Sequence, residues 1–120
     1  MDPIAEDDRR VVNLSTGAFE PFLAQDGTPD GEVLQVNPNN PKGYGFHLYR
    51  MAPGQVTVPH KHLGDEEFFI LEGDLSDHDG FEYGPGDLVW LRDGTEHSSS
   101  TRGGCVLVVY LPGDASPGGA

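Results

Sequence analysis

The sequence predicts an all-β protein that folds as a single domain. Its apolar runs are short, and 17 glycines and 10 prolines fall between them, which is typical of strands joined by tight turns. No stretch of useful length shows the apolar period of a helix. Roughly eight to eleven short strands, with turns about every eight to twelve residues, indicate a sandwich or a barrel. A chain of 120 residues is long enough for one such domain with its own core, and not for two.

Apolar stretches bounded by turn residues place the strands. Pro21 favours the edge of a sheet for the strand that contains it. The stretches 88–91 and 105–111 are strongly apolar, so we expect them to be buried. The Asp-Gly pair that ends the segment 77–80 predicts a hairpin turn. The expected strands are residues 11–14, 19–23, 32–37, 44–51, 67–71, 88–91 and 105–111.

The two ends of the chain differ from its middle. Residues 1–10 are polar, and residues 113–120 are polar and rich in glycine. We expect residues 1–10 to be a flexible N-terminal segment and residues 113–120 a flexible C-terminal tail. The predicted β-barrel then spans residues 11–112.

Charge and cysteine content exclude several classes of partner and compartment. The formal net charge is −13, from 20 acidic and seven basic residues, so the surface should repel nucleic acids and anionic lipid headgroups. The single cysteine, Cys105, excludes an intrachain disulfide and fits a reducing compartment. No apolar run approaches the roughly 20 residues that cross a bilayer, and the N-terminus lacks a signal-peptide pattern. We therefore expect a cytoplasmic protein with a small-molecule ligand.

A group of metal-ligating residue types lies in the middle of the sequence. His60 and His62 are two residues apart, so on a strand their side chains point to the same face. If the corner after them keeps the alternation, Glu66 faces the same way and Glu67 faces outward. Two imidazoles beside a carboxylate suit a divalent transition metal.

The full spacing around these residues resembles the first signature motif of the cupin superfamily. Gly54 is followed by five residues, His-x-His, three residues, Glu66, six residues and Gly73. The segment 92–97 resembles the second cupin motif and supplies a third histidine, although Arg92 stands where a proline is usual and Thr101 where an asparagine is frequent.

Residues 59–110 are similar to the ChrR-like class of cupins in particular. The runs that carry this similarity are His-x-His-Leu-Gly-x-Glu-Glu, Leu-Glu-Gly, Ser-Asp, Pro-Gly-Asp, Gly-x-x-His and Gly-Cys. The resemblance implies a double-stranded β-helix, or jelly-roll barrel, that binds one divalent metal ion such as Fe, Zn, Mn or Ni. The ligands that it implies are His60, His62, Glu66 and His97.

Such a site suggests three functions. We favour an Fe(II)-type dioxygenase acting on a small chelating carbonyl compound, because an enolate would bring one negative charge and two oxygens to the ion. The alternatives are a metal- or ligand-sensing regulatory domain related to anti-sigma factors, and a cupin that binds sugars or other polar ligands without turnover. With one cysteine, the chain lacks the His/Cys zinc-binding region of a complete anti-sigma factor of this kind.

The positions of other residues in the predicted strands indicate which of them lie in the core and which could line a ligand pocket. We expect Tyr49, Phe68, Ile70, Trp90 and Tyr110 to lie mainly in the core. Five residues are candidates to line a ligand pocket, namely Tyr49, Phe68, Ile70, Trp90 and Arg92.

For the remaining polar residues and for Cys105, we expect structural roles rather than roles in the chemistry of the site. His47 should be a core or rim histidine, His78 should be exposed, and Arg50 and Arg92 should pair with local carboxylates. Cys105 should be a buried, inert thiol. Cupin barrels often share edge strands, and we expect a homodimer formed through the N-terminal strands.

Overall fold

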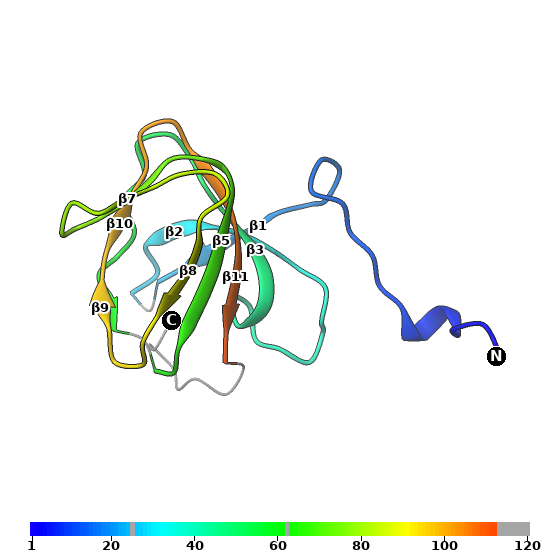
Figure 1. Cartoon of the computed structure of the whole chain (residues 1–120). Coiled ribbons are helices and arrows are strands. Elements are labelled where there is room, and N and C mark those ends of the chain that lie inside the picture. The colour runs from blue at the N-terminus through cyan, green and yellow to red at the C-terminus, as the bar shows by residue number, and fades with distance from the viewer. Residues whose placement is uncertain (25, 62, 113–120) are drawn as a thin grey trace.

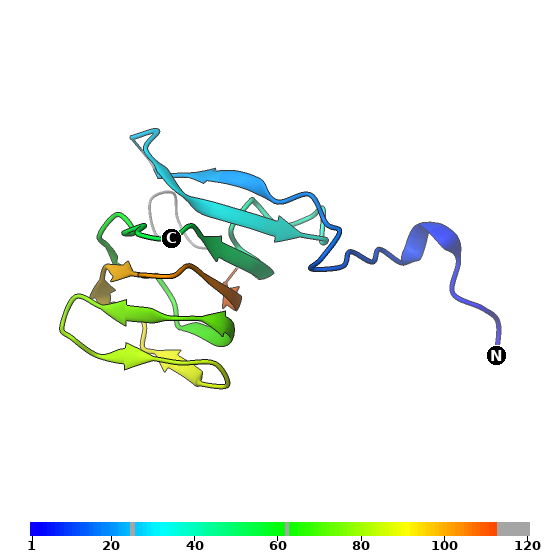
Figure 2. The ribbon, with the colours of Figure 1, turned by 90° about the horizontal axis from the view of Figure 1, so that it is seen from above.

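The computed structural model describes residues 1–24, 26–61 and 63–112, and its strands form an antiparallel β-barrel of the jelly-roll type (Figures 1 and 2). Before the first strand lies a single 3-10 turn, η1 (Glu6–Asp8). The strands are β1 (Glu20–Leu23), β2 (Pro29–Gln35), β3 (Gly45–Met51), β4 (His60–Lys61), β5 (Glu66–Gly73), β6 (Leu75–Asp77), β7 (Glu82–Tyr83), β8 (Leu88–Leu91), β9 (Glu96–His97), β10 (Ser99–Ser100) and β11 (Cys105–Leu111).

The strands form three sheets. The largest has six strands in the order β1-β2-β3-β11-β5-β8, and every neighbouring pair is antiparallel. A second sheet has the order β10-β6-β7, and β4 pairs with β9 in a third. The all-β prediction is confirmed, and six of the seven expected strands overlap an observed strand. In the described part of the chain no helix has the length and apolar character needed to cross a lipid bilayer.

The core lies between the large sheet and the two small ones. Its buried side chains come from β3, β5, β6 and β11, because alternate residues of each strand point inward. Ile70 is completely buried and Phe68 is 4% exposed, as expected for inward positions on β5. The core cluster consists of Met51, Phe68, Ile70, Leu75, Cys105, Leu107, Val109 and Leu111.

The prediction that Trp90 and Tyr110 lie in the core is wrong. Trp90 is 53% exposed and Tyr110 is 48% exposed, since both stand on the outward face of the six-stranded sheet. The expectation that residues 88–91 are buried holds only in part: Val89 and Leu91 are half-buried against the core, whereas Leu88 is 81% exposed. Residues 88–91 form β8, which lies at the end of the large sheet, and only the inward side of this strand is covered.

The predicted strand at residues 11–14 is also wrong. Asn13 instead forms local hydrogen bonds with the backbone. Its side-chain oxygen accepts the Ser15 N–H at 2.9 Å, and its backbone carbonyl accepts the Gly17 N–H at 2.7 Å. Such local hydrogen bonds compete with a β-ladder. Residues 1–16 are exposed and run away from the barrel as an arm (Figures 1 and 2). The sheet edge is formed by β1, and the expectations for residues 113–120 lie outside the described part of the chain.

Candidate metal centre

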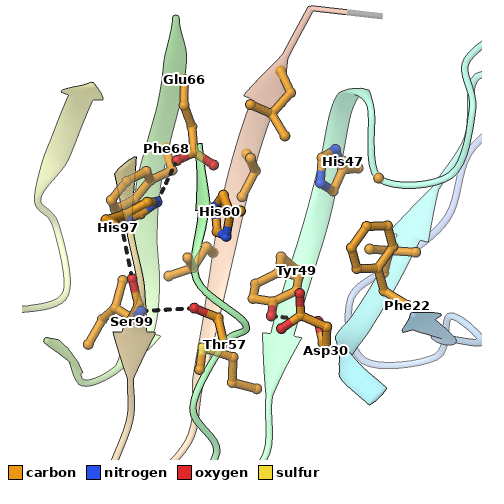
Figure 3. Close-up of a pocket in the computed structure, with 17 residues that line it drawn as sticks. Phe22, Asp30, His47, Tyr49, Thr57, His60, Glu66, Phe68, His97 and Ser99 are labelled. Atoms are coloured by element: carbon orange, nitrogen blue, oxygen red, sulfur yellow. Dashed lines mark hydrogen bonds and ion pairs between the residues drawn. The ribbon is translucent and has the colours of Figure 1, made fainter. Parts of the chain in front are cut away.

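One cavity inside the barrel is lined by three histidines and two carboxylic acid side chains (Figure 3). Its volume is about 80 Å³. Since one water-sized group needs roughly 10–15 Å³ on this measure, the cavity holds only a few such groups. The residues that line it are Phe22, Asp30, Val33, Gly43, His47, Tyr49, Met51, Thr57, His60, Glu66, Phe68, Leu75, His97, Ser99, Leu107, Val109 and Leu111.

The register of β4 against β9 brings two of the expected ligands together. His60 stands directly opposite His97, so both side chains project to the same face, and their ring centroids are 4.8 Å apart. The register is supported by Thr57 and Ser99. The Thr57 N–H donates to the Ser99 carbonyl, and the Ser99 N–H donates to Thr57 Oγ1, both at 2.8 Å.

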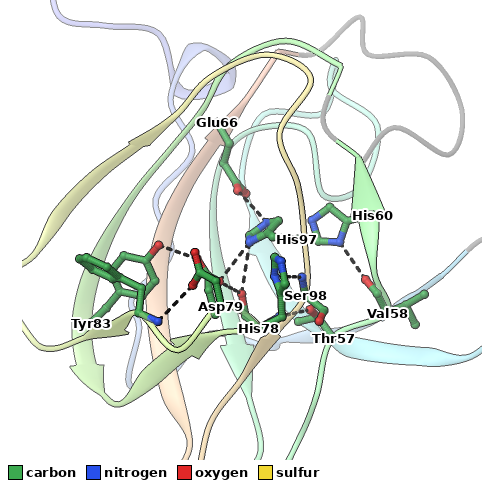
Figure 4. A network of polar contacts seen from close by, with 12 residues as sticks. Thr57, Val58, His60, Glu66, His78, Asp79, Tyr83, His97 and Ser98 are labelled. Atoms are coloured by element: carbon green, nitrogen blue, oxygen red, sulfur yellow. Dashed lines mark hydrogen bonds and ion pairs between the residues drawn. The ribbon is translucent and has the colours of Figure 1, made fainter.

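The two imidazoles are oriented in the same way. His60 Nδ1 lies 2.9 Å from the Val58 carbonyl (Figure 4). His97 Nδ1 lies 3.1 Å from Asp77 Oδ1. A carbonyl and a carboxylate only accept hydrogen bonds, so each Nδ1 carries a hydrogen. Nε2 is therefore the ring nitrogen of each histidine that can coordinate a cation.

Glu66 faces the same cavity as these histidines. It is 9% exposed, and its Oε1 lies 3.6 Å from His97 Nε2. Glu67, the next residue on β5, is exposed, which agrees with the alternation expected from the sequence. Burial alone would lower the pKa of His97, but hydrogen bonds and charge from Asp77 and Glu66 outweigh it and raise that pKa to about 9.

Asp77 is the residue of this site that the sequence did not indicate. Its carboxylate accepts the hydrogen of His97 Nδ1, the Ser99 hydroxyl at 2.5 Å and the Tyr83 hydroxyl at 2.6 Å. Burial would raise the pKa of Asp77, but these three hydrogen bonds lower it below its usual range. In the sequence, Asp77 belongs to a turn motif, and nothing in its spacing connects it to His97.

Two aspartates tie together the loops that carry the site. The Gly64 N–H donates to Asp93 Oδ1, and the Asp93 N–H donates to Asp65 Oδ1, both at 2.7 Å. Asp65 directly precedes Glu66, and Asp93 lies in the loop that leads to β9. This reciprocal pair fixes the first motif against the second.

The other expected pocket residues divide into two groups. Tyr49 and Phe68 line the cavity, and Ile70 is buried in the core beyond the set of lining residues. Trp90 and Arg92 do not line it: the Trp90 Nε1–H donates to Asp65 at 3.0 Å, and the Arg92 guanidinium lies 5.5 Å from the Trp90 ring. Both side chains are exposed at the surface.

Four further assignments of single residues follow the sequence, whereas Arg92, expected to pair with a carboxylate, lies near the Trp90 ring and forms no ion pair with a described residue. His78 is exposed, and Cys105 is 4% exposed. Arg50 pairs with Glu32 at 3.1 Å. His47 is 5% exposed and lines the cavity, so it is both a core and a cavity residue.

The donor chemistry fits a divalent transition metal ion. Two imidazoles that present Nε2 and one buried carboxylate face one cavity, which is the kind of donor set that such ions prefer. Among residues 1–24, 26–61 and 63–112 alone, no group of three or more His, Cys, Asp or Glu side chains is arranged to hold a metal ion. The fourth expected ligand, His62, lies outside the described residues.

Comparison with known proteins identifies the family and its fold. Residues 9–112 match the ChrR cupin-like domain. The polyketide cyclase RemF from Streptomyces resistomycificus is similar in structure, with a TM-score of 0.69, 23% identity and coverage of 91% of this chain and 82% of that one. A predicted oxalate decarboxylase from Thermotoga maritima has a TM-score of 0.62, 22% identity and coverage of 85% of this chain and 99% of that one.

The fold also occurs in a regulatory complex. The Rhodobacter sphaeroides complex of SigE with the anti-sigma ChrR matches with a TM-score of 0.61 and 21% identity, over 82% of this chain and 51% of that chain. The present chain therefore spans about half of that matched chain. Comparison with curated proteins gives no significant match.

Proposed function

Because the chain belongs to the family of ChrR cupin-like domains, we propose that it is a mononuclear metal-binding cupin. One divalent ion is held by three imidazoles and one carboxylate, which are those of His60, His62, Glu66 and His97. The observation that carries this proposal is the shared orientation of the two described histidines. A hydrogen bond from Nδ1 fixes each ring so that Nε2 is the coordinating atom.

The favoured activity is that of an Fe(II)-type dioxygenase acting on a small chelating carbonyl compound. A bound ion would supply Lewis acidity toward a carbonyl oxygen and, in the case of Fe(II), reactivity toward dioxygen. The chain contributes a cavity of about 80 Å³, which admits only a small ligand. Phe22, Phe68, Leu107 and Val109 make much of its wall apolar and limit access of water.

A regulatory domain without turnover is the second candidate. It is supported by the similarity in fold to the anti-sigma ChrR in complex with SigE. In that role the same cavity would bind a metal ion or a small ligand and alter a protein contact. The two candidates differ in one measurable property, which is consumption of substrate.

Elemental analysis of the purified protein tests the metal site. We expect close to one equivalent of Fe, Zn, Mn or Ni in the wild-type protein and its loss in His60→Ala and His97→Ala. His78→Ala removes an exposed histidine and should keep the metal. If the wild-type protein holds no metal after reconstitution, or if all three variants keep it, the assignment of ligands is wrong.

Oxygen uptake then separates the two candidate functions. The Fe(II)-loaded protein is supplied with a panel of 1,3-diketones and hydroxyketones, and the His97→Ala variant serves as the inactive reference. Oxygen consumption that depends on both the metal and the carbonyl compound supports the dioxygenase. Metal binding without any turnover supports the regulatory domain.

A further inference from the structure

The wall of the cavity contributed by β2 and β3 carries two polar groups that the proposed metal site does not use. Asp30 on β2 and His47 on β3 both line the cavity, while Glu66 and His97 belong to β5 and β9 (Figure 3). Asp30 is 8% exposed and His47 is 5% exposed. Buried polar groups require hydrogen-bond partners, so the partners of these two residues are informative.

His47 presents a hydrogen-bond acceptor to the cavity. Its Nδ1 lies 3.0 Å from the Gly45 carbonyl, so Nδ1 carries the hydrogen. Burial lowers the pKa of His47, which keeps the ring neutral at about pH 7 and leaves a lone pair on Nε2. In the described part of the chain no donor is hydrogen-bonded to this nitrogen.

Asp30 presents a second acceptor. Its Oδ1 accepts the Val58 N–H at 3.1 Å, and within the described residues no donor reaches Oδ2. Burial raises the pKa of Asp30, so its carboxylate lacks the stabilisation that water would give. The Tyr49 hydroxyl, which also lines the cavity, donates to the backbone carbonyl of Asp30 at 2.7 Å and not to the carboxylate.

We propose that Asp30 and His47 form a hydrogen-bond-accepting wall that selects chelating ligands carrying an N–H or O–H donor. This inference rests on the proposed metal site and narrows its ligand class. A chelator without a donor, such as a simple diketone, leaves both buried acceptors unpaired when it displaces water. A hydroxyketone or a hydroxamate satisfies at least one of them while its two oxygens bind the ion.

Two hydroxamates provide the test. Acetohydroxamic acid and N-methylacetohydroxamic acid are both anionic two-oxygen chelators, and only the first has an N–H. Each is titrated into the Co(II)-loaded protein, and the change in the visible Co(II) spectrum gives the dissociation constant. We expect the wild-type protein to bind acetohydroxamic acid at least about tenfold more tightly than its N-methyl analogue.

Variants separate hydrogen bonding from steric exclusion of the methyl group. His47→Leu and Asp30→Asn should each reduce this preference toward one, and Asp30→Asn keeps the shape of the side chain. His78→Leu and Asp26→Asn make the same changes at exposed positions and should leave the preference unchanged.

The outcomes distinguish this inference from the proposal on which it rests. Failure of the wild-type protein to bind Co(II) contradicts the metal site itself. If Co(II) binds, then equal affinity for the two hydroxamates, binding of neither, or a preference that persists in both cavity variants overturns the donor-selecting wall.

Discussion

The Asp77 carboxylate orients the His97 ring in the same way as the Val58 carbonyl orients the His60 ring. Both acceptors fix the hydrogen on Nδ1, but the carboxylate is itself held by the Ser99 and Tyr83 hydroxyls. An acceptor of this kind sets the tautomer and the ring orientation of a ligating histidine and raises its basicity. Asp77 is thus a positioning residue of the proposed metal centre.

Asp77→Asn is expected to lower the affinity for a divalent metal by about 10–100-fold, because the amide offers one acceptor oxygen to three donors. Isothermal titration with Zn(II) measures the change. Asp79→Asn, two residues further along in the same turn and exposed, should have no such effect. Thermal unfolding of both variants in a chelator shows whether a loss of affinity merely reflects a loss of folding. An Asp77→Asn protein with wild-type affinity would exclude the positioning role.

Cys105 illustrates how burial alone can suppress reactivity. Its side chain is 4% exposed, and burial raises the pKa of the thiol to about 11. Compared with the ordinary value near 9, this lowers the thiolate fraction at about pH 8 roughly a hundredfold. We expect alkylation by iodoacetamide, followed by mass spectrometry, to be at least that much slower in the native protein than in denaturing guanidinium chloride. Equal rates in the two conditions would contradict the burial of this thiol.

At the scale of elements, the junction between β5 and β11 leaves no room for a side chain at Gly73. Gly73 has a φ of 88°, and a Cβ placed there would lie 2.0 Å from the Gly104 carbonyl oxygen and 2.6 Å from Cys105 Cα. Both obstacles are backbone atoms, so neither can move without disturbing the ladder. This glycine closes the strand that begins at Glu66.

Gly73→Ala should therefore destabilise the fold by about 2–5 kcal/mol, which combines backbone strain with steric overlap. Gly80→Ala isolates the strain, because φ there is 89° and nothing lies within 4 Å of the added carbon, and we expect a loss of about 1–2 kcal/mol. Gly84→Ala has neither problem and should change stability by about 0.5 kcal/mol or less. Urea unfolding in a chelator ranks the three, and a Gly73→Ala variant as stable as Gly84→Ala would contradict the close approach.

Local signals in the sequence predicted the strands, and long-range contacts explain what those signals missed. Alternation on β5 correctly placed Glu66 inward and Glu67 outward, because that pattern depends on neighbouring residues alone. The exposure of Trp90 could not be inferred, since it depends on the position of β8 at the end of the sheet. The roles of Asp77 and Asp30 arise from contacts across 20 and 28 residues, which only the register of the sheets determines.

At the scale of the whole molecule, the outward face of the large sheet is rich in apolar side chains, although the chain as a whole is strongly acidic. One row across β3, β11, β5 and β8 is entirely apolar and in register, and it consists of Leu48, Val108, Phe69 and Leu88. The next row adds Phe46, Tyr110 and Trp90, which are 64%, 48% and 53% exposed. Contiguous apolar surface of this kind marks an interaction site.

The expected homodimer has a second candidate surface in this face, beside the N-terminal strands. Of those strands, the one expected at residues 11–14 does not form, whereas β1 lies at the edge of the large sheet. Two chains of formal net charge −13 repel each other, and a contact between them requires a surface with few carboxylates. The apolar rows supply such a surface, with Glu67 as the acidic residue within them, and a two-fold axis would place the same rows on both partners.

Leu88→Glu tests this arrangement, because Leu88 is 81% exposed and adds nothing to the core of one chain. We expect sedimentation velocity to show a wild-type dimer and a monomeric Leu88→Glu variant, since each two-fold contact would bury two new carboxylates without partners. Val56→Glu introduces the same charge at a position 61% exposed outside the large sheet and should remain dimeric. A monomeric wild-type protein, or a dimer that survives Leu88→Glu, would mean that this face does not join two copies of the chain.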